Sequence, residues 1–374
     1  MKIAFIGQKG IPVTFGGVEY NVDRLSRELV RFGHDVTVYV RSWYTQKSMK
    51  NYDGVRLIHV PTIKSKHLDA SVHSFLCSIH ALFGRYDIIH YHGIGPSFFS
   101  LLPKLMNKNI VATIHRLDWN SEKWGKRAKV FLKFGEYISV KIPDRTIVVS
   151  ANLKEYIKEK YKKDAIHIPH GIDKPRRLPP MIIKEKYGLN GKDYVLFLGR
   201  LVPEKRVDWL IEAFQSTEHK SPRAKNMKLV IAGGSSATPD YVKQLKEMSI
   251  NDENIIYTGY VTGDEKAELL SNALLFSLPS HLEGFPIALL EAKSFGLCSL
   301  VSDIPPHREA IHSEIDGILF KSDELSELSQ KLLKLIENPD NTETMGRNAR
   351  KNMEALPGWE YVAEKIEELF KGVL

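Results

Sequence analysis

The protein has 374 residues, 43% of them hydrophobic and 26% charged, a composition typical of globular proteins that argues against a disordered chain. No run of about 18 or more apolar residues occurs, so the sequence predicts no membrane-spanning helix. The net charge of +8 is uneven, because residues 1–172 carry a net +13 and residues 173–374 a net −5.

The uneven charge indicates that the first half of the chain faces an anionic partner, either a membrane surface or a nucleic acid. Ordinary surface lysines are the alternative explanation. The two cysteines, Cys77 and Cys298, lie far apart and form no metal-ligand pair, which favours a reduced, cytosolic compartment.

Short β-branched apolar runs alternate with longer segments of helical periodicity, the pattern of βαβ units around a parallel sheet. In the first half, Val18–Phe32 has apolar residues spaced for one helix face, and Gly33 follows where a C-terminal cap is expected. The strands expected in the first half are Lys2–Gly7, Asp35–Val40, Val55–Val60, Ile88–Tyr91, Ile110–Ile114 and Thr146–Val149.

The second half restarts the alternation after a proline-rich, charged stretch, Asp173–Pro180, which is the expected linker. We therefore expect one domain over residues 1–172, a second over 173–356, and a final helix over 357–374 that packs back on the first. The strands expected in the second half are Tyr194–Leu198, Lys228–Ala232, Ile255–Tyr257, Leu274–Leu278 and Ser299–Ser302.

Ligands of open parallel sheets bind beyond the carboxyl ends of the strands, so the residues just past each strand are the candidates for a site. After the first strand, Gly16 and Gly17 open the next helix, where free backbone N–H groups favour a phosphate. The glycine spacing is not that of the G-x-G-x-x-G dinucleotide fingerprint, and this argues against a nicotinamide dehydrogenase.

Two further strand ends carry charged side chains. Arg200 and Lys205 follow the first strand of the second half, and two cations in such a loop suit a diphosphate. Later, Glu283 lies in a loop before a helix expected to begin at Pro286, and Glu291 lies inside that helix. The N–H groups at the start of this helix, at Ile287 and Ala288, would face an anion.

Taken together, these motifs resemble those of the family 4 retaining glycosyltransferases. Two glutamates separated by seven residues, with Glu-Gly-Phe-Pro at 283–286, are similar to that family's signature. The loop at 199–205 resembles its diphosphate loop, and the resemblance covers nearly the whole chain. The other matching motifs are Phe-Gly-Gly-Val-Glu at 15–19, Thr-Ile-His at 113–115 and Ile-Pro-His-Gly-Ile-Asp at 168–173.

The resemblance implies an α/β fold of the GT-B type, with two facing Rossmann-like domains, an interdomain cleft and a C-terminal crossover helix. The first domain would recognise the acceptor and the second would bind the sugar nucleotide. It implies catalytic roles for His115, which would orient the donor sugar, for Arg200 and Lys205, which would bind the diphosphate, and for Glu283, which would hold the sugar hydroxyls. The remaining substrate-binding residues would be Gly16, Gly17, Gly284, Phe285, Pro286, Ile287, Ala288, Glu291, Tyr260 and Val261.

No cofactor and no metal are expected. The chain contains no Asp-x-Asp, the motif of metal-bridged diphosphate binding, and the two cations Arg200 and Lys205 would act in place of Mg²⁺. His90 and His92 form an H-x-H pair, but no Asp, Glu or Cys at metal-ligand spacing joins them, so they are expected to border the acceptor side of the cleft.

Residues 7–12 and 115–129 are similar to a branch of bacterial cell-surface polysaccharide enzymes that includes rhamnosyltransferases. The second segment interleaves tryptophans with lysines, a composition that suits a membrane interface. We therefore expect transfer of a hexose or deoxyhexose from a nucleoside-diphosphate sugar to a glycan acceptor carried on a polyprenyl diphosphate. The enzyme would be cytoplasmic and peripheral, docked on the anionic inner face of the membrane through its basic N-terminal domain.

Two other functions remain open at this point. A sugar-nucleotide epimerase of the same two-domain fold would need no acceptor. A non-enzymatic basic scaffold for membrane or nucleic acid would explain the charge, but no nucleic-acid-binding motif is present and the paired glutamates would be left without a role.

Overall fold

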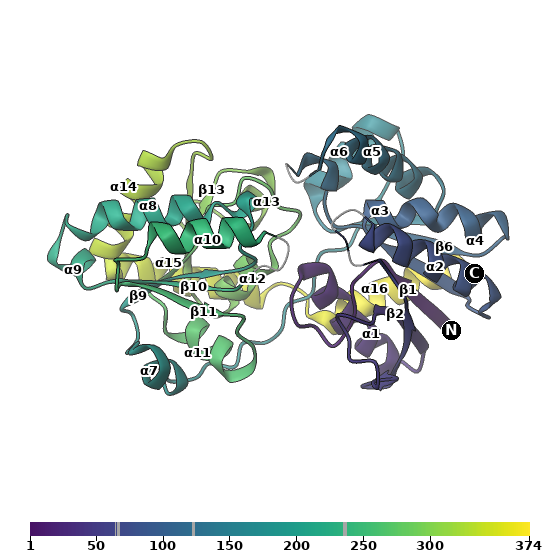
Figure 1. Ribbon diagram of the computed structural model, residues 1–374, viewed down its shortest axis with the longest axis horizontal. Coiled ribbons are helices and arrows are strands. Elements are labelled where there is room, and N and C mark those ends of the chain that lie inside the picture. Colours follow the sequence, from purple (N-terminus) through teal and green to yellow (C-terminus); the bar gives the residue numbers. More distant parts are fainter. Residues whose placement is uncertain (64, 66–67, 122–123, 235–237) are drawn as a thin grey trace. The chain divides into compact units, whose positions relative to one another are not determined.

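A computed structural model describes residues 1–63, 65, 68–121, 124–234 and 238–374. The chain divides into two compact units: unit 1, formed by Met1–Gly171 and Pro357–Leu374, and unit 2, formed by Ile172–Leu356. Each unit contains its own sheet with helices packed on it (Figure 1). Over these described ranges, no helix is long and apolar enough to cross a membrane.

Unit 1 is built on a sheet that, in the part of the chain described, has eight strands in the order β3-β4-β2-β1-β5-β6-β7-β8. Its pairs are parallel except β3 with β4. The strands are β1 (Lys2–Ile6), β2 (Asp35–Arg41), β3 (Asn51–Tyr52), β4 (Val55–Val60), β5 (Ile88–His92), β6 (Ile110–Ile114), β7 (Arg145–Val148) and β8 (Ile166–His167). The helices are α1 (Gly17–Arg31), α2 (Asp69–Phe83), α3 (Ile94–Ser97), α4 (Leu101–Leu105), α5 (Lys126–Lys141), α6 (Ala151–Tyr161) and α16 (Trp359–Lys371), with the 3-10 turns η1 (Phe98–Ser100) and η2 (Asp118–Asn120).

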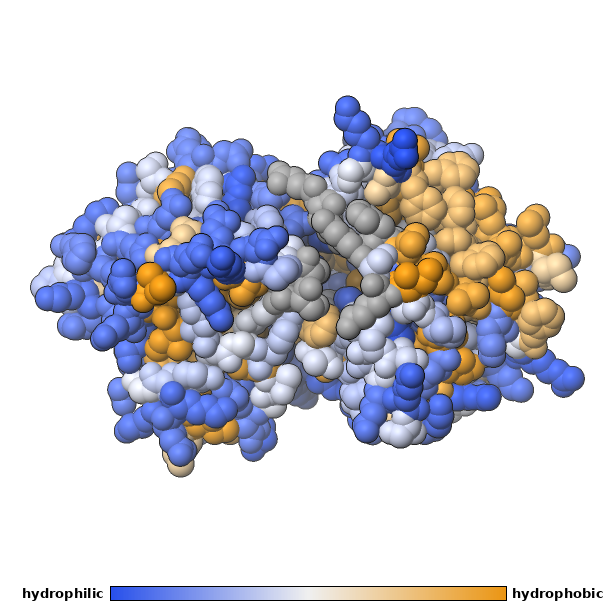
Figure 2. Space-filling model, viewed as in Figure 1, coloured by the Kyte–Doolittle hydropathy of each residue, from blue (hydrophilic) through white to orange (hydrophobic). Residues whose placement is uncertain are grey.

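Alternate residues of β1 point to opposite faces of this sheet, as strand geometry requires. Ile3 and Phe5 are buried in a cluster that includes residues of α1 and α16, whereas Ala4 and Ile6 are buried in a cluster that includes residues of α2. Both faces are covered, which explains why the strands read as continuous apolar runs. A broad apolar area also lies on the outside of unit 1, over the region of α2 and α4 (Figure 2).

The C-terminal helix belongs to unit 1, although the whole of unit 2 separates it from the rest of unit 1 in sequence. The Trp359 ring lies 5.8 Å from the Tyr20 ring of α1, and Phe370 is fully buried among residues of β1 and β2. A Cβ atom on Gly171 would lie 2.6 Å from the Trp359 side chain, so this close contact requires glycine. The helix therefore completes one face of the unit 1 core.

Unit 2 is built on a parallel sheet that, among the described residues, has six strands in the order β11-β10-β9-β12-β13-β14. The strands are β9 (Tyr194–Leu198), β10 (Lys228–Ala232), β11 (Ile255–Gly259), β12 (Leu275–Leu278), β13 (Cys298–Ser302) and β14 (Gly317–Phe320). The helices are α7 (Ile182–Tyr187), α8 (Val207–Glu218), α9 (Pro222–Lys225), α10 (Pro239–Met248), α11 (Gly263–Asn272), α12 (Ile287–Ser294), α13 (Pro305–Ala310), α14 (Leu325–Glu337) and α15 (Pro339–Glu354), with the 3-10 turn η3 (Pro203–Lys205).

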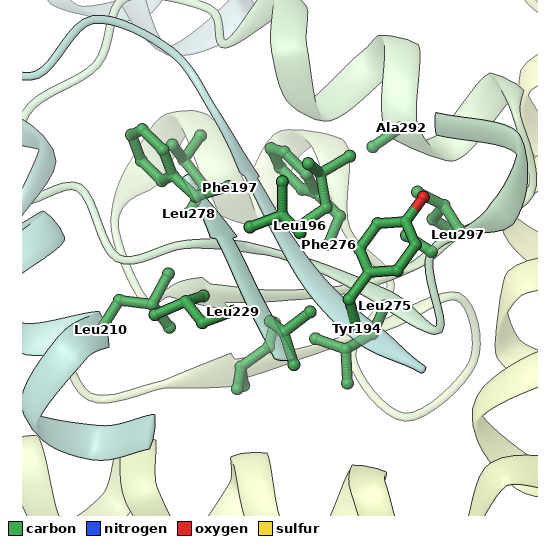
Figure 3. Packing of buried hydrophobic residues seen from close by; sticks show 14 of the residues in the cluster. Tyr194, Leu196, Phe197, Leu210, Leu229, Leu275, Phe276, Leu278, Ala292 and Leu297 are labelled. Atoms are coloured by element: carbon green, nitrogen blue, oxygen red, sulfur yellow. The ribbon is translucent and has the colours of Figure 1, made fainter. Parts of the chain in front are cut away.

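The core of unit 2 is centred on β9 and β12. Phe197 and Phe276 are fully buried there, and Figure 3 shows them with Leu210 of α8 and Ala292 of α12 in the same cluster. Tyr194 is also fully buried, and its hydroxyl donates a 2.6 Å hydrogen bond to the Leu269 carbonyl, so the one polar atom of this side chain is satisfied.

The α/β fold class expected from the sequence is confirmed, and the expected strands lie within two residues of the observed ones. Three short strands were not expected: β3, β8 and β14. The expected cap of α1 is also confirmed, because Gly33 has a φ of 84° and the His34 N–H donates to the Leu29 carbonyl at 3.1 Å.

The stretch expected to act as a linker, Asp173–Pro180, is fixed to unit 2 by hydrogen bonds. Leu178 bonds through its N–H to Ser271 at 3.0 Å and through its carbonyl to the Asn272 side chain at 2.9 Å. Arg176 pairs with Asp264 at 2.9 Å. This stretch therefore runs along unit 2 as an anchored segment.

Candidate functional site

Glycine backbone brings three strand ends of unit 2 close together. The Gly199 N–H donates to the Ala232 carbonyl at 3.0 Å, and the Gly233 N–H donates to the Gly259 carbonyl at 2.8 Å. Gly233 has a φ of 143°, and a Cβ atom there would lie 1.8 Å from the Gly199 oxygen, so no other residue fits. The residues that follow β9, β10 and β11 therefore start from one compact edge.

Lys205, which follows β9, and Glu283, which follows β12, form an ion pair at the strand ends of unit 2. Their side chains are only 15% and 9% exposed, respectively. Burial is the largest single influence and raises the pKa of Glu283, but the charge and hydrogen bond of Lys205, together with contributions from other neighbouring groups, hold the pKa below its ordinary value. Glu283 is therefore a carboxylate at neutral pH, and it comes with its own neutralising cation.

A buried histidine, His307, lies close enough to Glu283 to influence the pKa of its carboxyl group. This residue was not predicted from the sequence. Burial lowers the pKa of His307 to about 4. Its Nδ1 lies 2.8 Å from the Ser302 carbonyl, which can only accept, so Nδ1 carries the proton of the neutral ring. His307 is therefore an uncharged neighbour of the ion pair.

The helix α12 begins at Ile287, with Pro286 as its N-terminal cap residue, so the expected start at Pro286 was one residue early. The N–H groups of Leu289 and Leu290 both donate to the Pro286 carbonyl. Within the described residues, no side chain caps this helix and no hydrogen bond to the N–H of Ile287 or Ala288 is present. These two N–H groups can therefore receive an anion.

Other expected residues of unit 2 differ in how accessible they are. Glu291, inside α12, pairs with Lys266 of α11 at 2.5 Å, a partner that sequence analysis did not identify. Gly284 and Phe285 lie half-buried in the loop after Glu283, and Phe285 packs against the core. Arg200, just past β9, is also half-buried.

Tyr260 and Val261 follow β11. The Tyr260 ring is 46% exposed, and its hydroxyl donates to the Gly234 carbonyl at 2.8 Å, which fixes the ring in place. Arg200 lies close enough to Tyr260 to oppose the rise in its pKa that burial causes. Val261, in contrast, is buried in the core, so its side chain does not face a ligand.

In unit 1, Gly16 caps the start of α1 with a φ of 109°. A Cβ atom at Gly16 would lie 1.8 Å from the Glu19 carboxylate, and the same carboxylate accepts from the Lys9 N–H at 3.0 Å and from its Nζ at 3.1 Å. The start of α1 thus already has a carboxylate beside it, while Gly17 is exposed. Gly16 is needed first of all to make room for Glu19.

Four histidines from three parts of unit 1 lie in a row. His92 of β5 contacts His115, just past β6, through a 3.0 Å hydrogen bond between Nδ1 and Nε2. The His115 ring stacks on the His170 ring at 5.7 Å, and Asn21 of α1 bonds to Nδ1 of His170 at 2.8 Å. His90 lies at the other end, with its ring 4.3 Å from that of His92.

These imidazoles are neutral because they are buried. Burial lowers the pKa of His90 to about 3 and that of His170 to about 4. Burial, together with repulsion from the neighbouring rings, also lowers the pKa of His92 and His115 well below the ordinary value. Over the described residues, no group of three or more His, Cys, Asp or Glu side chains, this row included, is arranged so that it could hold a metal ion. His115 can therefore offer an uncharged hydrogen-bonding edge.

The tryptophan- and lysine-containing segment at 115–129 is partly turned inward. The Trp119 indole donates to Glu136, a fully buried carboxylate that also accepts from Lys160 at 2.8 Å and Tyr161 at 2.6 Å. Glu122 and Lys123 lie outside the described residues. Trp119 is therefore held by its own unit through Glu136.

Each half of the chain matches a family model. Residues 15–176 match the model described as Glycosyltransferase Family 4, and residues 181–352 match the model described as Glycosyl transferases group 1. The two matches together span most of the chain.

Individual proteins are similar over most of their length. An uncharacterised glycosyltransferase of Methanocaldococcus jannaschii is 25% identical over 99% of this chain and 98% of its own. The UDP-Gal:α-D-GlcNAc-diphosphoundecaprenol α-1,3-galactosyltransferase of Escherichia coli is 27% identical over 85% of this chain and 84% of its own. An Anabaena protein, crystallised with UDP and glucose, has the same fold with a TM-score of 0.82, 17% identity and complete coverage of both chains.

Proposed function

Since this chain belongs to glycosyltransferase family 4, with the GT-B fold, it is a glycosyltransferase, and we propose that it is a hexosyltransferase that uses a nucleoside-diphosphate sugar. The donated sugar would be a hexose or deoxyhexose, and the acceptor a glycan. The observation that carries the proposal is the Lys205–Glu283 ion pair, which belongs to the same edge of unit 2 as the uncapped start of α12.

The diphosphate is assigned to Arg200, Lys205 and the N–H groups of Ile287 and Ala288. A diphosphate carries charge on several oxygens, and a guanidinium, an ammonium and a helix N-terminus each stabilise such charge. Charge on the leaving diphosphate grows as the bond to the sugar breaks. Preorganised donors aimed at that charge lower the barrier without a cofactor. We propose that no metal ion takes part, in keeping with the absence of Asp-x-Asp from the sequence.

The two carboxylates are assigned to hydroxyl groups of the donor. Glu283 would accept from the hydroxyls of the transferred sugar, and Glu291 from those of the ribose. Each carboxylate is paired with its own lysine, Lys205 and Lys266 respectively, which orients it. The Tyr260 ring, exposed but fixed by its hydroxyl, would pack against the base.

We propose that transfer retains the anomeric configuration, by attack on the face from which the diphosphate leaves, with the leaving phosphate as the base. His115 would orient the sugar as a neutral hydrogen-bonding group, since its lowered pKa keeps it uncharged. NMR of the anomeric proton during the first turnovers tests this step. An inverted product would contradict it.

The acceptor is assigned to unit 1 and is proposed to be carried on a polyprenyl diphosphate. The Escherichia coli relative, whose name states a diphosphoundecaprenol-linked acceptor, supports this proposal. The net charge of +13 over residues 1–172 supports a cytoplasmic enzyme that associates with an anionic membrane surface.

Thermal unfolding with a panel of UDP, GDP, ADP, dTDP and NAD tests the proposal. A ligand at about 100 times its dissociation constant stabilises the folded state by about 2.7 kcal/mol. We expect one nucleoside diphosphate to raise the melting temperature, to the same extent with and without EDTA. A shift with NAD alone would contradict the proposed function, and a shift that EDTA abolishes would contradict metal independence.

A further inference from the structure

The outer surface of unit 1 carries a continuous group of exposed apolar side chains, which we call the apolar face. Figure 2 shows its apolar colour over the region of α2 and α4. Phe134 of α5 is 52% exposed and Leu105 of α4 is 79% exposed. The apolar face consists of Phe75, Phe83, Leu105, Met106, Val130, Phe134 and Tyr137.

Ring contacts join the helices beneath this face into one surface. The Phe75 ring of α2 lies 5.8 Å from Phe99 of η1, and Phe99 lies 5.2 Å from Phe98. Phe98 in turn lies 5.9 Å from Phe134 of α5, which stacks on Tyr137 at 6.2 Å. Contiguous exposed apolar surface of this kind marks an interaction site more often than isolated apolar residues do.

Cations border the apolar face. On α5, Arg127, Val130, Phe134, Tyr137 and Lys141 follow one another at three- and four-residue intervals, so the apolar stripe has a cation at each end. The exposed cations of the border are Lys126, Arg127, Lys133 and Lys141.

The acidic residues of this region do not neutralise that border. Within the described part of residues 68–141, each acidic side chain has another partner. The pairs are Asp69 with Arg41 at 2.6 Å, Asp87 with the Lys2 N–H at 2.7 Å, Asp118 with Arg116 at 2.7 Å and Glu136 with Lys160 at 2.8 Å.

The first turn of α5 places Lys126 and Arg127 at the positive end of the helix dipole, where helix stability favours acidic residues. That turn contains no acid, and Gly125 caps it without a side-chain hydrogen bond. An external anion beside this turn would offset the repulsion between the two cations and the positive end of the helix dipole. A lipid bilayer would supply anionic headgroups beside Lys126 and Arg127 and hydrocarbon against Val130 and Phe134.

We propose that the apolar face and its basic border are the surface by which unit 1 docks on an anionic lipid bilayer. This proposal deepens the proposed function and rests on it, because docking brings the enzyme to a polyprenyl-linked acceptor that lies in the membrane. A second copy of the chain is a poorer occupant, because a two-fold contact through this face would bring two sets of bordering cations together.

Flotation with vesicles tests the docking surface. The full chain is mixed with vesicles of phosphatidylcholine, with or without phosphatidylglycerol, in the absence of donor and acceptor. We expect binding to the anionic vesicles to be roughly tenfold stronger and to weaken as salt is raised. Leu105→Ser with Phe134→Ser should weaken it by at least about tenfold, because two apolar side chains no longer enter the bilayer.

Lys126→Glu with Arg127→Glu should weaken binding to anionic vesicles by at least about tenfold, since each cation near the surface contributes about fivefold. Matched controls on unit 2 change the same residue types at exposed positions. Ile250→Ser with Ile315→Ser, and Lys220→Glu with Arg223→Glu, should leave flotation unchanged.

Wild-type binding by both unit 1 variants, or no vesicle binding by the wild type, would overturn the proposal. So would a wild-type dimer in sedimentation velocity that Leu105→Ser with Phe134→Ser dissociates. Unchanged melting temperatures confirm that the variants fold. The nucleoside-diphosphate panel, run on the same variants, keeps the two proposals apart: a protein that binds vesicles but no nucleotide retains the docking surface and loses the proposed function.

Discussion

The two units prepare their candidate sites in opposite electrostatic ways. Unit 1 comes mostly from the strongly basic half of the chain, but the row of histidines at its strand ends is buried and neutral. Unit 2 comes from the acidic half, yet Lys205 and Glu283 form an ion pair at its strand ends.

The difference shows that net charge and local charge serve different purposes. The first half carries exposed cations on outer surfaces, such as the border of the apolar face, where we propose that they attract an anionic membrane at long range. In unit 2, Lys205 is paired with Glu283 at the strand ends, where we propose that a diphosphate binds. If this comparison is right, substitutions in the two units should impair different measured properties of the protein.

Lys205→Ala should have the largest effect, about a thousandfold loss in kcat/KM. It removes a cation of the proposed diphosphate site and leaves Glu283 buried without its partner. Steady-state kinetics with the donor identified by the panel would measure the loss. Lys321→Ala breaks the exposed pair with Glu324 and should be near wild type. Equal kinetics for the two variants would contradict the assignment.

The neutral histidines predict that stability depends on pH. The pKa of His170 is about 4 when folded and about 6.5 when unfolded, so the unfolded chain binds the proton more tightly. Its contribution is complete above pH 6.5 and is lost as pH falls toward 4, by roughly 3 kcal/mol.

Denaturant unfolding followed by circular dichroism between pH 7 and 5 measures this slope. The free energy of unfolding should fall as pH is lowered, and His170→Gln should reduce the slope. A stability that is flat over this range in the wild type would mean that the histidine row is not held neutral.

His115→Ala should lower kcat by roughly a hundredfold and leave nucleoside-diphosphate affinity unchanged. The residue lies in unit 1, far along the chain from the diphosphate loop, and its proposed role concerns the sugar alone. Kinetics combined with nucleotide titration separate the two effects. An equal loss of nucleotide affinity would remove the contrast between the units.

Tyr260 should give the smallest effect. Tyr260→Ala should weaken nucleotide binding by about tenfold, because the base loses its aromatic partner. Tyr260→Phe keeps the ring and loses only a half-exposed hydrogen bond to Gly234, so a change of less than about threefold is expected. If both variants bind the nucleotide equally weakly, the Tyr260 hydroxyl, and not its ring, is responsible for the contribution to binding.

Much of the fold was predictable because its strands are buried on both faces. Such strands, for example Ile110–Ile114 and Lys228–Ala232, form continuous apolar runs with turn residues at their ends, and they were placed correctly. The strands β3 and β8 were missed because two-residue strands carry too little pattern, and the four-residue strand β14 was also missed. Candidate residues such as Arg200 and Glu283 could be proposed because ligands bind beyond strand ends.

The contacts among these residues could not be read from the sequence. Lys205 and Glu283 are 78 positions apart, and their pairing depends on η3 and β12 meeting at one edge. His115 and His170 approach one another only through the register of β6, β7 and β8. The tryptophans and lysines around Trp119 suggested a membrane interface, yet the Trp119 indole donates a hydrogen bond to a buried carboxylate, Glu136.

Calorimetric titration of the nucleoside diphosphate, in the presence of EDTA, tests the central claim most directly. It compares the wild type with Lys205→Ala and His115→Ala. We predict that the wild type and His115→Ala bind alike, and that Lys205→Ala loses most of its affinity. Wild-type affinity in Lys205→Ala would contradict the account, because the nucleotide would then be held by groups other than those at the strand ends of unit 2.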